Sequence, residues 1–550
     1  MTSIMNDFDF QFKYVFENSW RLLALQDRDP TSPTYGCFDY KYWRDKTSEF
    51  PDARFQEAGA TLYLLAANAN FKHEVSDNLG SPRSDDWLQA FEASISFLRK
   101  IQYKNGSFDE WYKGERGFAA TEFIAIAYSA CLLHPEGISD TVLPTVKNIV
   151  NKACEWLSSR HDLVKGNHEA AAAAALAMAG RALDEKYFLA SAKDKIENLS
   201  ARQVDEGWFP EVGGMDLGYC SVTLDYVMLY VEYSRDQKPI NMMRKLFHFM
   251  HPFIQPDLTI ASDAGLCMNP YLSRLGMGLL SQFDQAAANI VFKLQNQSPA
   301  LRGLEPTMAD DLRMCRWSYL PVLVNLVKSK FVSNSRDVIV ANAGQWSYFK
   351  ESSVALYSDV VGKVYFYIAG GGNIKIYSGK KCICDFRGLV FGSKNSYYSS
   401  RGYSRARKVG INRDSVDVNF SLVESKSFNP RWVSRLLLRL ACTTEIGSNW
   451  SRKAIDFYRV NNGTALNQSS TPSARGRNLG VLKREITITG QKVLIKEIAD
   501  IENTDSIDEI YLQVFNKLIP LASFSLKKAK LKIETSIDRI SGEIAILKNE

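Results

Sequence analysis

Two stretches that superimpose without a gap decide the fold: Gln102-Tyr-Lys-Asn-Gly106-Ser-Phe108-Asp-Glu110 and Gln203-Val-Asp-Glu-Gly207-Trp-Phe209-Pro-Glu211. Gln, Gly, Phe and Glu coincide, and each stretch is followed by a loop and a predicted helix. Repetition of this kind is the sequence signature of stacked supersecondary units. We therefore predict repeated helical hairpins closed into an α/α toroid, whose inner helix ends open onto one cavity. The alternative is a chance similarity between two helix-ending turns.

The character of the sequence changes once along the chain. Up to about residue 330, apolar residues at helical spacing among good helix formers predict helices at Ala58–Asn68, Asp86–Lys100, Thr121–Leu133, Val146–Ser158, Glu169–Ala182, Ala190–Leu199, Val222–Tyr233 and Asn241–Phe253. Beyond it, short β-branched and aromatic runs with glycine turns predict strands at Val338–Val340, Val354–Tyr357, Val364–Ile368, Ile374–Tyr377, Ser415–Leu422, Arg484–Ile488 and Val493–Ile498. The tract Asn461–Asn478 is polar, and we expect a loop between strands there.

The fold class expected is therefore multidomain, α then β. We predict an N-terminal α/α toroid over residues 1–335 and a C-terminal antiparallel β-sandwich over residues 336–550. A chain of 550 residues is indeed too long for one ordinary core. The contents of 45% hydrophobic and 23% charged residues are normal for a folded soluble protein.

The net charge and the aromatic content bear on the kind of partner. A net charge of +6 does not call for nucleic acid, and a mild positive balance suits an acidic polysaccharide. Aromatic residues make up 12% of the chain, which fits a groove for sugar rings as well as it fits a large core. We expect an acidic polysaccharide or oligosaccharide as the partner and no nucleic acid. The sequence leaves the oligomeric state open.

The N-terminal segment and the cysteines bear on location. Met1–Trp20 carries Asp7, Asp9 and Glu17 and has no basic region before an apolar run, so we predict no secretory signal. We find no apolar stretch of about 20 residues and expect no membrane span. The nine cysteines form no CxxC pair or Cys/His cluster, which favours reduced thiols in a cytoplasmic protein. We expect no metal site and no cofactor.

Three motifs follow one another in the helical part. They are Tyr35–Asp45 with Arg54–Glu57 after it, Lys165-Gly-Asn167-His168-Glu169 before an alanine-rich helix, and Gly213–Tyr219. This order resembles the heparinase II/III-type polysaccharide lyases, in which an Asn or His on one inner helix faces a Tyr on a later one. The resemblance implies a lyase that cleaves a uronate-containing polysaccharide by β-elimination. It also agrees with a toroid followed by a β-sandwich.

The chemistry of elimination explains these residue types. The enzyme must hydrogen-bond the uronate carboxylate as charge builds, take the C5 proton with a base, and protonate the leaving C4 oxygen with an acid. Asn167 and His168 are the candidates for neutralisation, and a helix start there would favour a neutral His that accepts a proton. Tyr219 is the candidate acid or base, and its counterpart in the other repeat is Phe118. The competing interpretations are that Asn167 is only an N-cap and Tyr219 only a core aromatic.

Ten more residues are candidates for substrate binding. Trp and Tyr stack on sugar faces, and Arg pairs with carboxylates or sulfates through two N–H groups. The candidates are Trp43, Arg44, Trp111, Tyr112, Arg116, Trp208, Glu211, Asp216, Tyr397 and Arg401. Taken singly, each is more often ordinary packing or a surface ion pair. Tyr397 and Arg401 lie in the Tyr- and Arg-rich stretch Lys394–Lys408, which we expect to reach over the cleft.

In one respect the chain departs from the family it resembles. Members of that family usually add a histidine from the β-domain, whereas all six histidines here fall in the helical part: His73, His134, His161, His168, His248 and His251. The departure removes the ligands for a β-domain metal site of the usual His-containing kind. It also leaves the exact reaction open.

Four functions remain open on sequence alone, because a toroid does not fix function. The first is the lyase, and the second is a uronyl C5-epimerase, which abstracts the same proton. The third is a glycoside hydrolase that uses two carboxylates such as Glu110, Glu211 or Asp216. The fourth is a non-catalytic glycan-binding protein of capsule or exopolysaccharide assembly. A lyase or epimerase requires Tyr219 and Asn167 or His168 to converge, and a hydrolase requires two facing acids.

Overall fold

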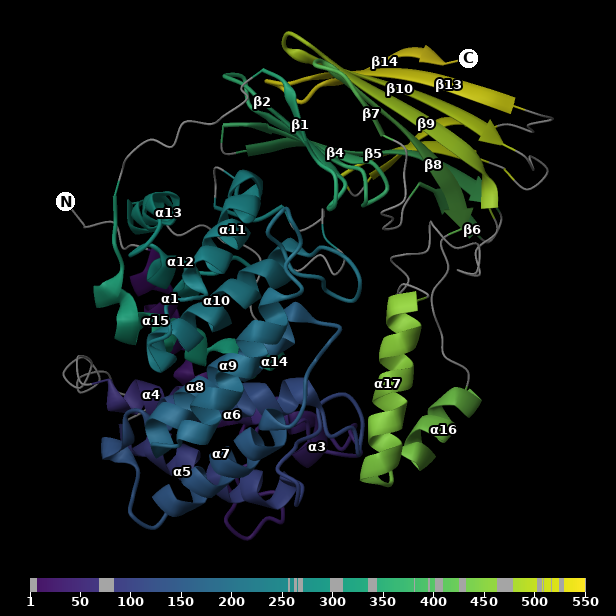
Figure 1. The fold of residues 1–550 in the computed structure, drawn as a ribbon. Helices are drawn as coiled ribbons and strands as arrows, with labels where there is room; N and C mark the ends of the chain where they lie inside the picture. The colour runs from purple at the N-terminus through teal and green to yellow at the C-terminus, as the bar shows by residue number, and fades with distance from the viewer. Residues whose placement is uncertain are drawn as a thin grey trace.

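The helical part of the protein precedes a β part (Figure 1). The computed structural model describes residues 7–68, 84–255, 258–261, 265, 271–296, 310–334, 344–379, 381–393, 396–400, 409–424, 432–461, 478–501, 507, 509–515, 517–523 and 529–549. The helices of the first part are α1 (Asp7–Glu17), α2 (Ser19–Leu25), α3 (Tyr40–Trp43), η1 (Ala53–Gln56), α4 (Glu57–Ala67), α5 (Ser84–Ile101), α6 (Phe118–Leu132), η3 (Pro135–Gly137), α7 (Leu143–Ser158), α8 (Gly166–Leu183), α9 (Lys186–Ser200), α10 (Leu217–Ser234), α11 (Ile240–Met250), η4 (His251–Phe253), α12 (Leu275–Leu280), α13 (Gln285–Asn296), α14 (Asp311–Trp317), α15 (Tyr319–Val327) and η7 (Lys328–Lys330).

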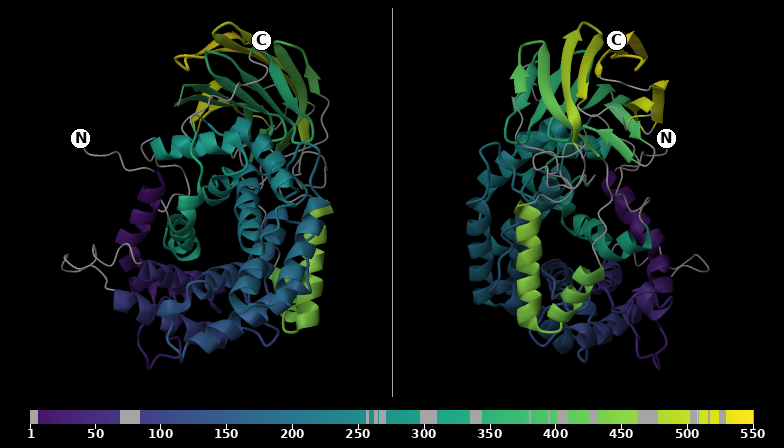
Figure 2. Two further views of the ribbon diagram at one scale, coloured as in Figure 1. Left: turned by 60° about the vertical axis from the view of Figure 1, so that its left-hand side comes forward. Right: turned by 90° about the vertical axis from the view of Figure 1, so that its right-hand side faces the viewer.

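The helices are arranged in pairs around a closed circuit (Figure 2). The helices α4, α6, α8, α10, α12 and α15 each contact the next, and α15 contacts α4 again; α5, α7, α9, α11, α13 and α1 each pack on one of these six. The sequence explains which helices form the circuit, because α6 and α8 are apolar nearly all round and such helices belong in the interior. In α8 the run Ala170–Ala175 is fully buried, and its small side chains allow close approach.

The two repeated stretches form the same turn. Gln102 Nε2 donates to the carbonyls of Gly106 (3.0 Å) and Ile149 (2.9 Å). Gln203 Nε2 donates in the same way to Gly207 (2.7 Å) and Met242 (2.9 Å). The repeat predicted from the sequence is therefore a structural repeat and no chance similarity.

A third copy of this turn escaped the sequence comparison. Gln26 Nε2 donates to the carbonyls of Gly36 (3.3 Å) and Ala90 (2.8 Å), and Gly36 has the same left-handed backbone, with φ of 91°. More residues separate Gln26 from Gly36 than separate Gln102 from Gly106, so a gapless alignment does not find it. Each copy ends on a buried phenylalanine, Phe38, Phe108 or Phe209.

The β part is an antiparallel sheet. Among the described residues its strands are β1 (Trp346–Phe349), β2 (Val354–Ser358), β3 (Lys363–Tyr367), β4 (Asn373–Ser378), β5 (Lys381–Ser393), β6 (Ser396–Ser399), β7 (Val409–Ile411), β8 (Ser415–Glu424), β9 (Asn478–Thr489), β10 (Lys492–Ile501), β11 (Glu509–Val514), β12 (Lys517–Ser523), β13 (Ala529–Asp538) and β14 (Ile544–Asn549). The main order is β1-β2-β3-β4-β5-β6-β8-β9-β10-β13-β14; β7 pairs with β8, and β11 pairs with both β5 and β12. The prediction of a helical part followed by an antiparallel β part is confirmed.

Strands β2 and β3 pack against both the helical part and the rest of the sheet, because their side chains alternate between two faces. Tyr365 and Tyr367 belong to the core of the helical part, whereas Val364 and Phe366 belong to the core of the sheet. Neighbouring side chains of a strand point to opposite faces, so one strand serves both cores. The Tyr365 hydroxyl also donates to the Pro252 carbonyl (3.0 Å), which ties β3 to η4.

Two helices interrupt the β part, where we predicted only strands and a loop. They are α16 (Trp432–Ala441) and α17 (Glu445–Asn461), between β8 and β9, and they lie beside the helical part (Figure 1). The apolar residues of α16 and α17 recur at helical spacing, but we predicted no element between Leu422 and Asn461. The predicted strand Val338–Val340 and nearly all of the predicted loop Asn461–Asn478 fall outside the described residues.

Candidate active site

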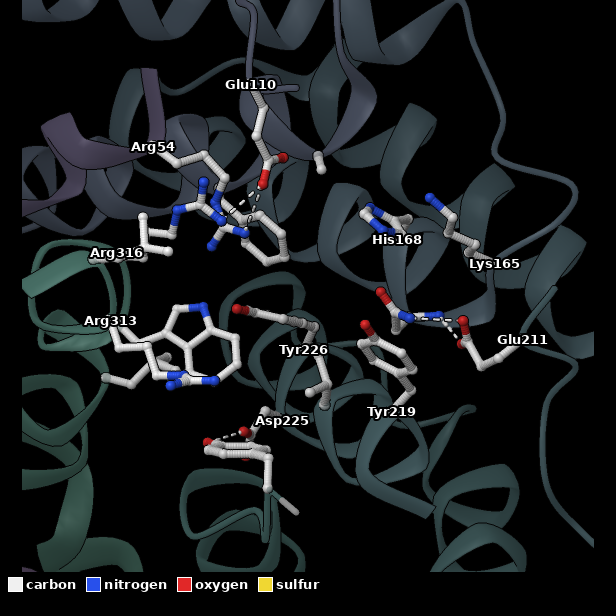
Figure 3. A pocket seen from close by; sticks show the side chains of 18 of the residues that line it. Arg54, Glu110, Lys165, His168, Glu211, Tyr219, Asp225, Tyr226, Arg313 and Arg316 are labelled. Atoms are coloured by element: carbon white, nitrogen blue, oxygen red, sulfur yellow. Dashed lines mark hydrogen bonds and ion pairs between the residues drawn. The ribbon is translucent and has the colours of Figure 1, made fainter. Parts of the chain in front are cut away.

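The ends of the circuit helices enclose a cavity of about 500 Å³ (Figure 3). It is lined by Arg54, Glu110, Trp111, Ala119, Phe123, Lys165, Asn167, His168, Glu211, Val212, Tyr219, Val222, Asp225, Tyr226, Tyr271, Asp310, Leu312, Arg313, Arg316, Trp317 and Leu320. The three residues predicted to be catalytic, Asn167, His168 and Tyr219, all line it. They come from the first turns of α8 and α10, which contact each other directly.

Asn167 is held by a carboxylate from the other repeat turn. Its backbone N–H and its Nδ2 donate to the two oxygens of Glu211, each over 2.7 Å. Glu211 is buried, and burial raises the pKa of its carboxyl well above the ordinary range. The N-cap of α8 is Lys165, so Asn167 is not a simple N-cap. Glu211 thus fixes the orientation of the Asn167 amide.

His168 is held by a buried carboxylate on α6. Its Nδ1 lies 2.6 Å from Glu122 Oε1, and its own side chain is 13% exposed. Burial raises the pKa of Glu122 well above the ordinary range. When Nδ1 donates to a carboxylate, Nε2 becomes the basic nitrogen of the imidazole. The arrangement is therefore suited to proton transfer at Nε2.

Tyr219 lies in the first turn of α10, close to Glu211 in Figure 3 and on the same side of the cavity as His168. Asp216 caps this helix, and its Oδ1 accepts the Tyr219 N–H over 2.9 Å. The Tyr219 side chain is half-buried, whereas its repeat counterpart Phe118 is 5% exposed and packs against Trp156. Only the copy with a hydroxyl lines the cavity.

Arginines form the opposite wall. Arg316 Nη1 lies 3.0 Å from Glu110 Oε1, and Arg54 Nη1 lies 3.7 Å from the same oxygen. Arg54 also donates to Glu57 over 2.7 Å. Two buried N–H groups on this wall, at Arg54 Nη2 and Arg316 Nε, have no hydrogen-bond partner within the part of the chain that is described. Buried donors of this kind are costly unless a ligand satisfies them, and an anion is the ligand that suits guanidinium.

The cavity also has aromatic walls and two further acids, Asp225 and Asp310. Trp111 is 70% exposed at its edge, and Trp317 packs edge to face on Tyr271, with ring centroids 5.8 Å apart. Asp225 accepts hydrogen bonds from the Tyr271 hydroxyl (2.6 Å) and from Ser273, and burial raises its pKa to about 6. Asp225 therefore shapes the wall through protein contacts.

The structure brings five predicted residues into the cavity and places others outside its lining. Glu211 and Trp111 line it together with the three catalytic candidates. Trp208 does not, because its ring is fully buried and its Nε1 donates to Glu206. Asp216 is fully buried as a helix cap and is not part of the lining either.

Four more candidates lie outside the cavity lining. Trp43 Nε1 donates to the Leu25 carbonyl (2.8 Å), and Arg44 pairs with Asp45 on the surface (2.9 Å). Arg116 donates to the carbonyl of Gly114 (3.1 Å), and Tyr112 is half-buried without reaching the cavity. Arg116 also donates to the carbonyls of Cys442 and Thr444, both over 3.4 Å, and so joins the helical part to the segment before α17.

The predicted contribution of the β part stays a prediction, because most of the stretch Lys394–Lys408 lies outside the described residues. Tyr397 is 48% exposed on β6 and packs near Tyr511, with ring centroids 6.4 Å apart, away from the cavity lining. Arg401 lies outside the described residues.

Sequence reasoning missed Arg313, Arg316, Trp317 and Glu122. The first three share α14 with i,i+3 spacing of the arginines, a signal that is also typical of a solvated helix face. Glu122 sits in an apolar helix, where a lone carboxylate is a hint of a paired partner. Its partner His168 is distant in sequence, so only the fold joins them.

The described residues also bear on metal binding and on membrane insertion. No group of three or more His, Cys, Asp or Glu side chains is placed to hold a metal ion there. The helices that can be assessed are all too short or too polar to cross a bilayer.

The chain was compared with known proteins. No family model and no curated protein matches it. A solved structure of the Streptomyces coelicolor A3 chondroitin AC lyase, in complex with chondroitin sulphate, does match, with a TM-score of 0.50 and 10% identity over 91% of this chain and 68% of that one. The chain is similar in fold to a polysaccharide lyase. Heparinase III (TM-score 0.44, 10% identity, 88% and 72% covered) and a D-mannose isomerase (TM-score 0.35, 13% identity, 57% and 97% covered) are weaker matches. At these identities the similarity shows the fold alone, and the heparinase II/III family stays a prediction.

Proposed function

We propose that this protein is a polysaccharide lyase that cleaves an acidic, uronate-containing polysaccharide by β-elimination. The observation that carries the proposal is the convergence of Asn167, His168 and Tyr219 in one cavity, opposite arginine N–H groups that lack a partner among the described residues. The closed circuit of paired helices fits an α/α toroid, and the sheet fits the β-sandwich that accompanies it. We propose the division into residues 1–335 and 336–550 on the same basis.

Each part of the reaction has a candidate group. The Asn167 amide, fixed by Glu211, hydrogen-bonds the uronate carboxylate as the enolate-like state develops. His168 Nε2 takes the C5 proton, and Glu122 stabilises the imidazolium that forms. The Tyr219 hydroxyl protonates the C4 oxygen as the C4–O bond breaks. The arginine wall and Trp111 bind the neighbouring sugars.

The carboxylates of the cavity favour this reaction over hydrolysis. A glycosidase needs two acids available to the sugar. Glu110 is paired with Arg316 and Arg54, and Glu211 accepts two N–H groups of Asn167. Asp225 is occupied by Tyr271 and Ser273, and Asp310 caps α14 by accepting the Arg313 N–H over 2.8 Å. Each of these acids therefore already forms hydrogen bonds or ion pairs with other groups of the protein.

The test is ultraviolet absorbance of the unsaturated uronate product during incubation with hyaluronan, chondroitin sulfate, heparosan and alginate. We expect a rise with at least one of them, and we expect Tyr219→Phe to slow it by at least about 100-fold, because the acid is lost. Tyr112→Phe removes a tyrosine hydroxyl outside the cavity lining and serves as the matched control.

Absence of any rise with all four polysaccharides contradicts elimination on them. Deuterium incorporation at C5 in heavy water without cleavage would then identify the epimerase, which shares the proton abstraction. Binding without either reaction would leave the glycan-binding function.

A further inference from the structure

We propose that a second cavity, formed against α17, holds the acidic polysaccharide chain beyond the sugars that react. This inference rests on the proposed function and extends it to a subsite whose outer wall comes from the β part of the chain. The cavity measures about 320 Å³ and is lined by Phe118, His161, Asp162, Leu163, Val164, Arg452, Lys453, Asp456 and Phe457. We call it the α17 cavity.

The α17 cavity adjoins the candidate active site. Val164 lines the α17 cavity, and the next residue, Lys165, lines the active-site cavity. The Val164 carbonyl accepts the N–H of Val212 over 3.0 Å, and Val212 also lines the active-site cavity. The bridged segments Val164–Lys165 and Glu211–Val212 thus lie between the two cavities, and a polysaccharide that crosses them meets both.

The outer wall is anchored to the helical part. Arg160 pairs with Glu445 over 3.1 Å, and the Ser448 hydroxyl donates to the Glu115 carbonyl over 2.7 Å. At Gly114, with φ of 79°, a Cβ would lie only 2.2 Å from the Cys442 carbonyl oxygen, so the chains touch there backbone to backbone. Anchoring at the start of α17 gives the cavity a fixed shape, as a subsite requires.

The lining has two chemical features that suit an acidic sugar, basic side chains and apolar surface. Arg452 and Lys453 supply positive charge for carboxylate or sulfate groups. Phe457 and Leu163 offer apolar surface to sugar faces, with exposed fractions of 71% and 66%. The lining also holds two acids, Asp162 and Asp456, and Asp162 Oδ1 accepts the N–H groups of Val164 (3.0 Å) and Lys165 (2.9 Å).

A buried cation packs against Phe118, one of the residues that line the α17 cavity. Lys195 is 1% exposed, and its Nζ lies 5.4 Å from the ring centroid of Phe118, which lines the cavity. The same ammonium is 3.9 Å from Glu169. Phe118 thus packs against an ion pair that is buried inside the helical part.

The test measures binding, so it does not depend on turnover. Tetra-, hexa- and octasaccharides of hyaluronan, chondroitin sulfate, heparosan and alginate are titrated into the full-length protein by calorimetry. We expect affinity to rise with length for a polysaccharide that binds. We expect Phe457→Ala, and Arg452→Ala with Lys453→Ala, to remove roughly tenfold from octasaccharide affinity while leaving tetrasaccharide affinity unchanged.

Trp450→Ala is the matched control, because Trp450 lies on the same helix, is also 71% exposed, and is not part of the cavity lining. Equal octasaccharide affinities for Phe457→Ala and Trp450→Ala overturn the subsite. Failure of every oligosaccharide to bind overturns the subsite together with the substrate class. A third outcome is that binding rises with length and is weakened by Phe457→Ala, but no polysaccharide gives an absorbance rise. That outcome supports the subsite and rejects only the elimination reaction.

Discussion

At the scale of single residues, the site depends on carboxylates that position other side chains. Glu211 receives two N–H groups from Asn167, so it determines where the Asn167 amide points. We predict that Glu211→Gln lowers kcat by about 100-fold. The NH2 group of the new glutamine faces the Asn167 NH2 group and pushes the Asn167 amide away from the position in which it binds the substrate carboxylate. The readout is kcat and KM on the polysaccharide that the wild type cleaves.

The control for this prediction is Glu206→Gln. Glu206 lies in the same repeat turn and accepts the N–H groups of Glu351 (2.6 Å) and Ser352 (3.0 Å), outside the cavity lining. It should lower the denaturation midpoint while leaving kcat near that of the wild type. A Glu211→Gln enzyme with normal kcat would remove Asn167 from the proposed mechanism.

At the scale of elements, the repeated glycine turn sets the path of the chain between helices. Gly106 has φ of 94°, and a Cβ would lie 2.0 Å from the Lys152 carbonyl oxygen. We predict that Gly106→Ala destabilises the protein by about 3 kcal/mol or more, since backbone strain adds to a backbone clash. Urea denaturation of the purified variant measures this loss.

Gly490→Ala is the comparison for the glycine prediction. Gly490 has φ of 57° but nothing within 4 Å of its Cβ position. Its loss should be about 1 kcal/mol, since strain acts there without a clash. Equal losses at both glycines would mean that the turn tolerates the side chain by moving away from α7.

At the scale of the whole molecule, the two parts meet at η4 and β3. His251 is packed against this contact, and burial, with the charge of Lys363, lowers its pKa from 6.5 to about 4. The unfolded chain therefore takes up a proton between pH 6.5 and 4 that the folded chain does not, so stability falls as the pH falls through this window.

We predict that His251→Gln flattens this part of the stability profile. Urea midpoints measured from pH 7 to pH 4 should decline less steeply for the variant than for the wild type. His134→Gln, at the end of α6 and away from this contact, controls for the loss of one histidine. Parallel profiles for wild type and His251→Gln would show that His251 is protonated equally in both states.

The sequence by itself determined what depends on local pattern. Apolar residues around the whole circumference of α6 and α8 required interior helices, and alternation in β2 and β3 required strands. The repeat fixed the glycine turns, and the Asn167-His168 motif with Tyr219 picked out residues that do share one cavity. The helix and strand signals are readable because each lies within one element, and the repeat is readable because its two copies match without a gap.

Only the tertiary structure decided what depends on partners distant in sequence. Glu122 meets His168, and Arg316 meets Glu110, because the circuit of helices closes and brings separate helix ends together. Trp208 resembles a sugar platform in sequence but is buried, since burial depends on the surrounding helices. The anchoring of α17 likewise depends on contacts such as that of Ser448 with Glu115. Residues so far apart in the sequence meet only when both parts have folded, because closing the long loop between them costs chain entropy.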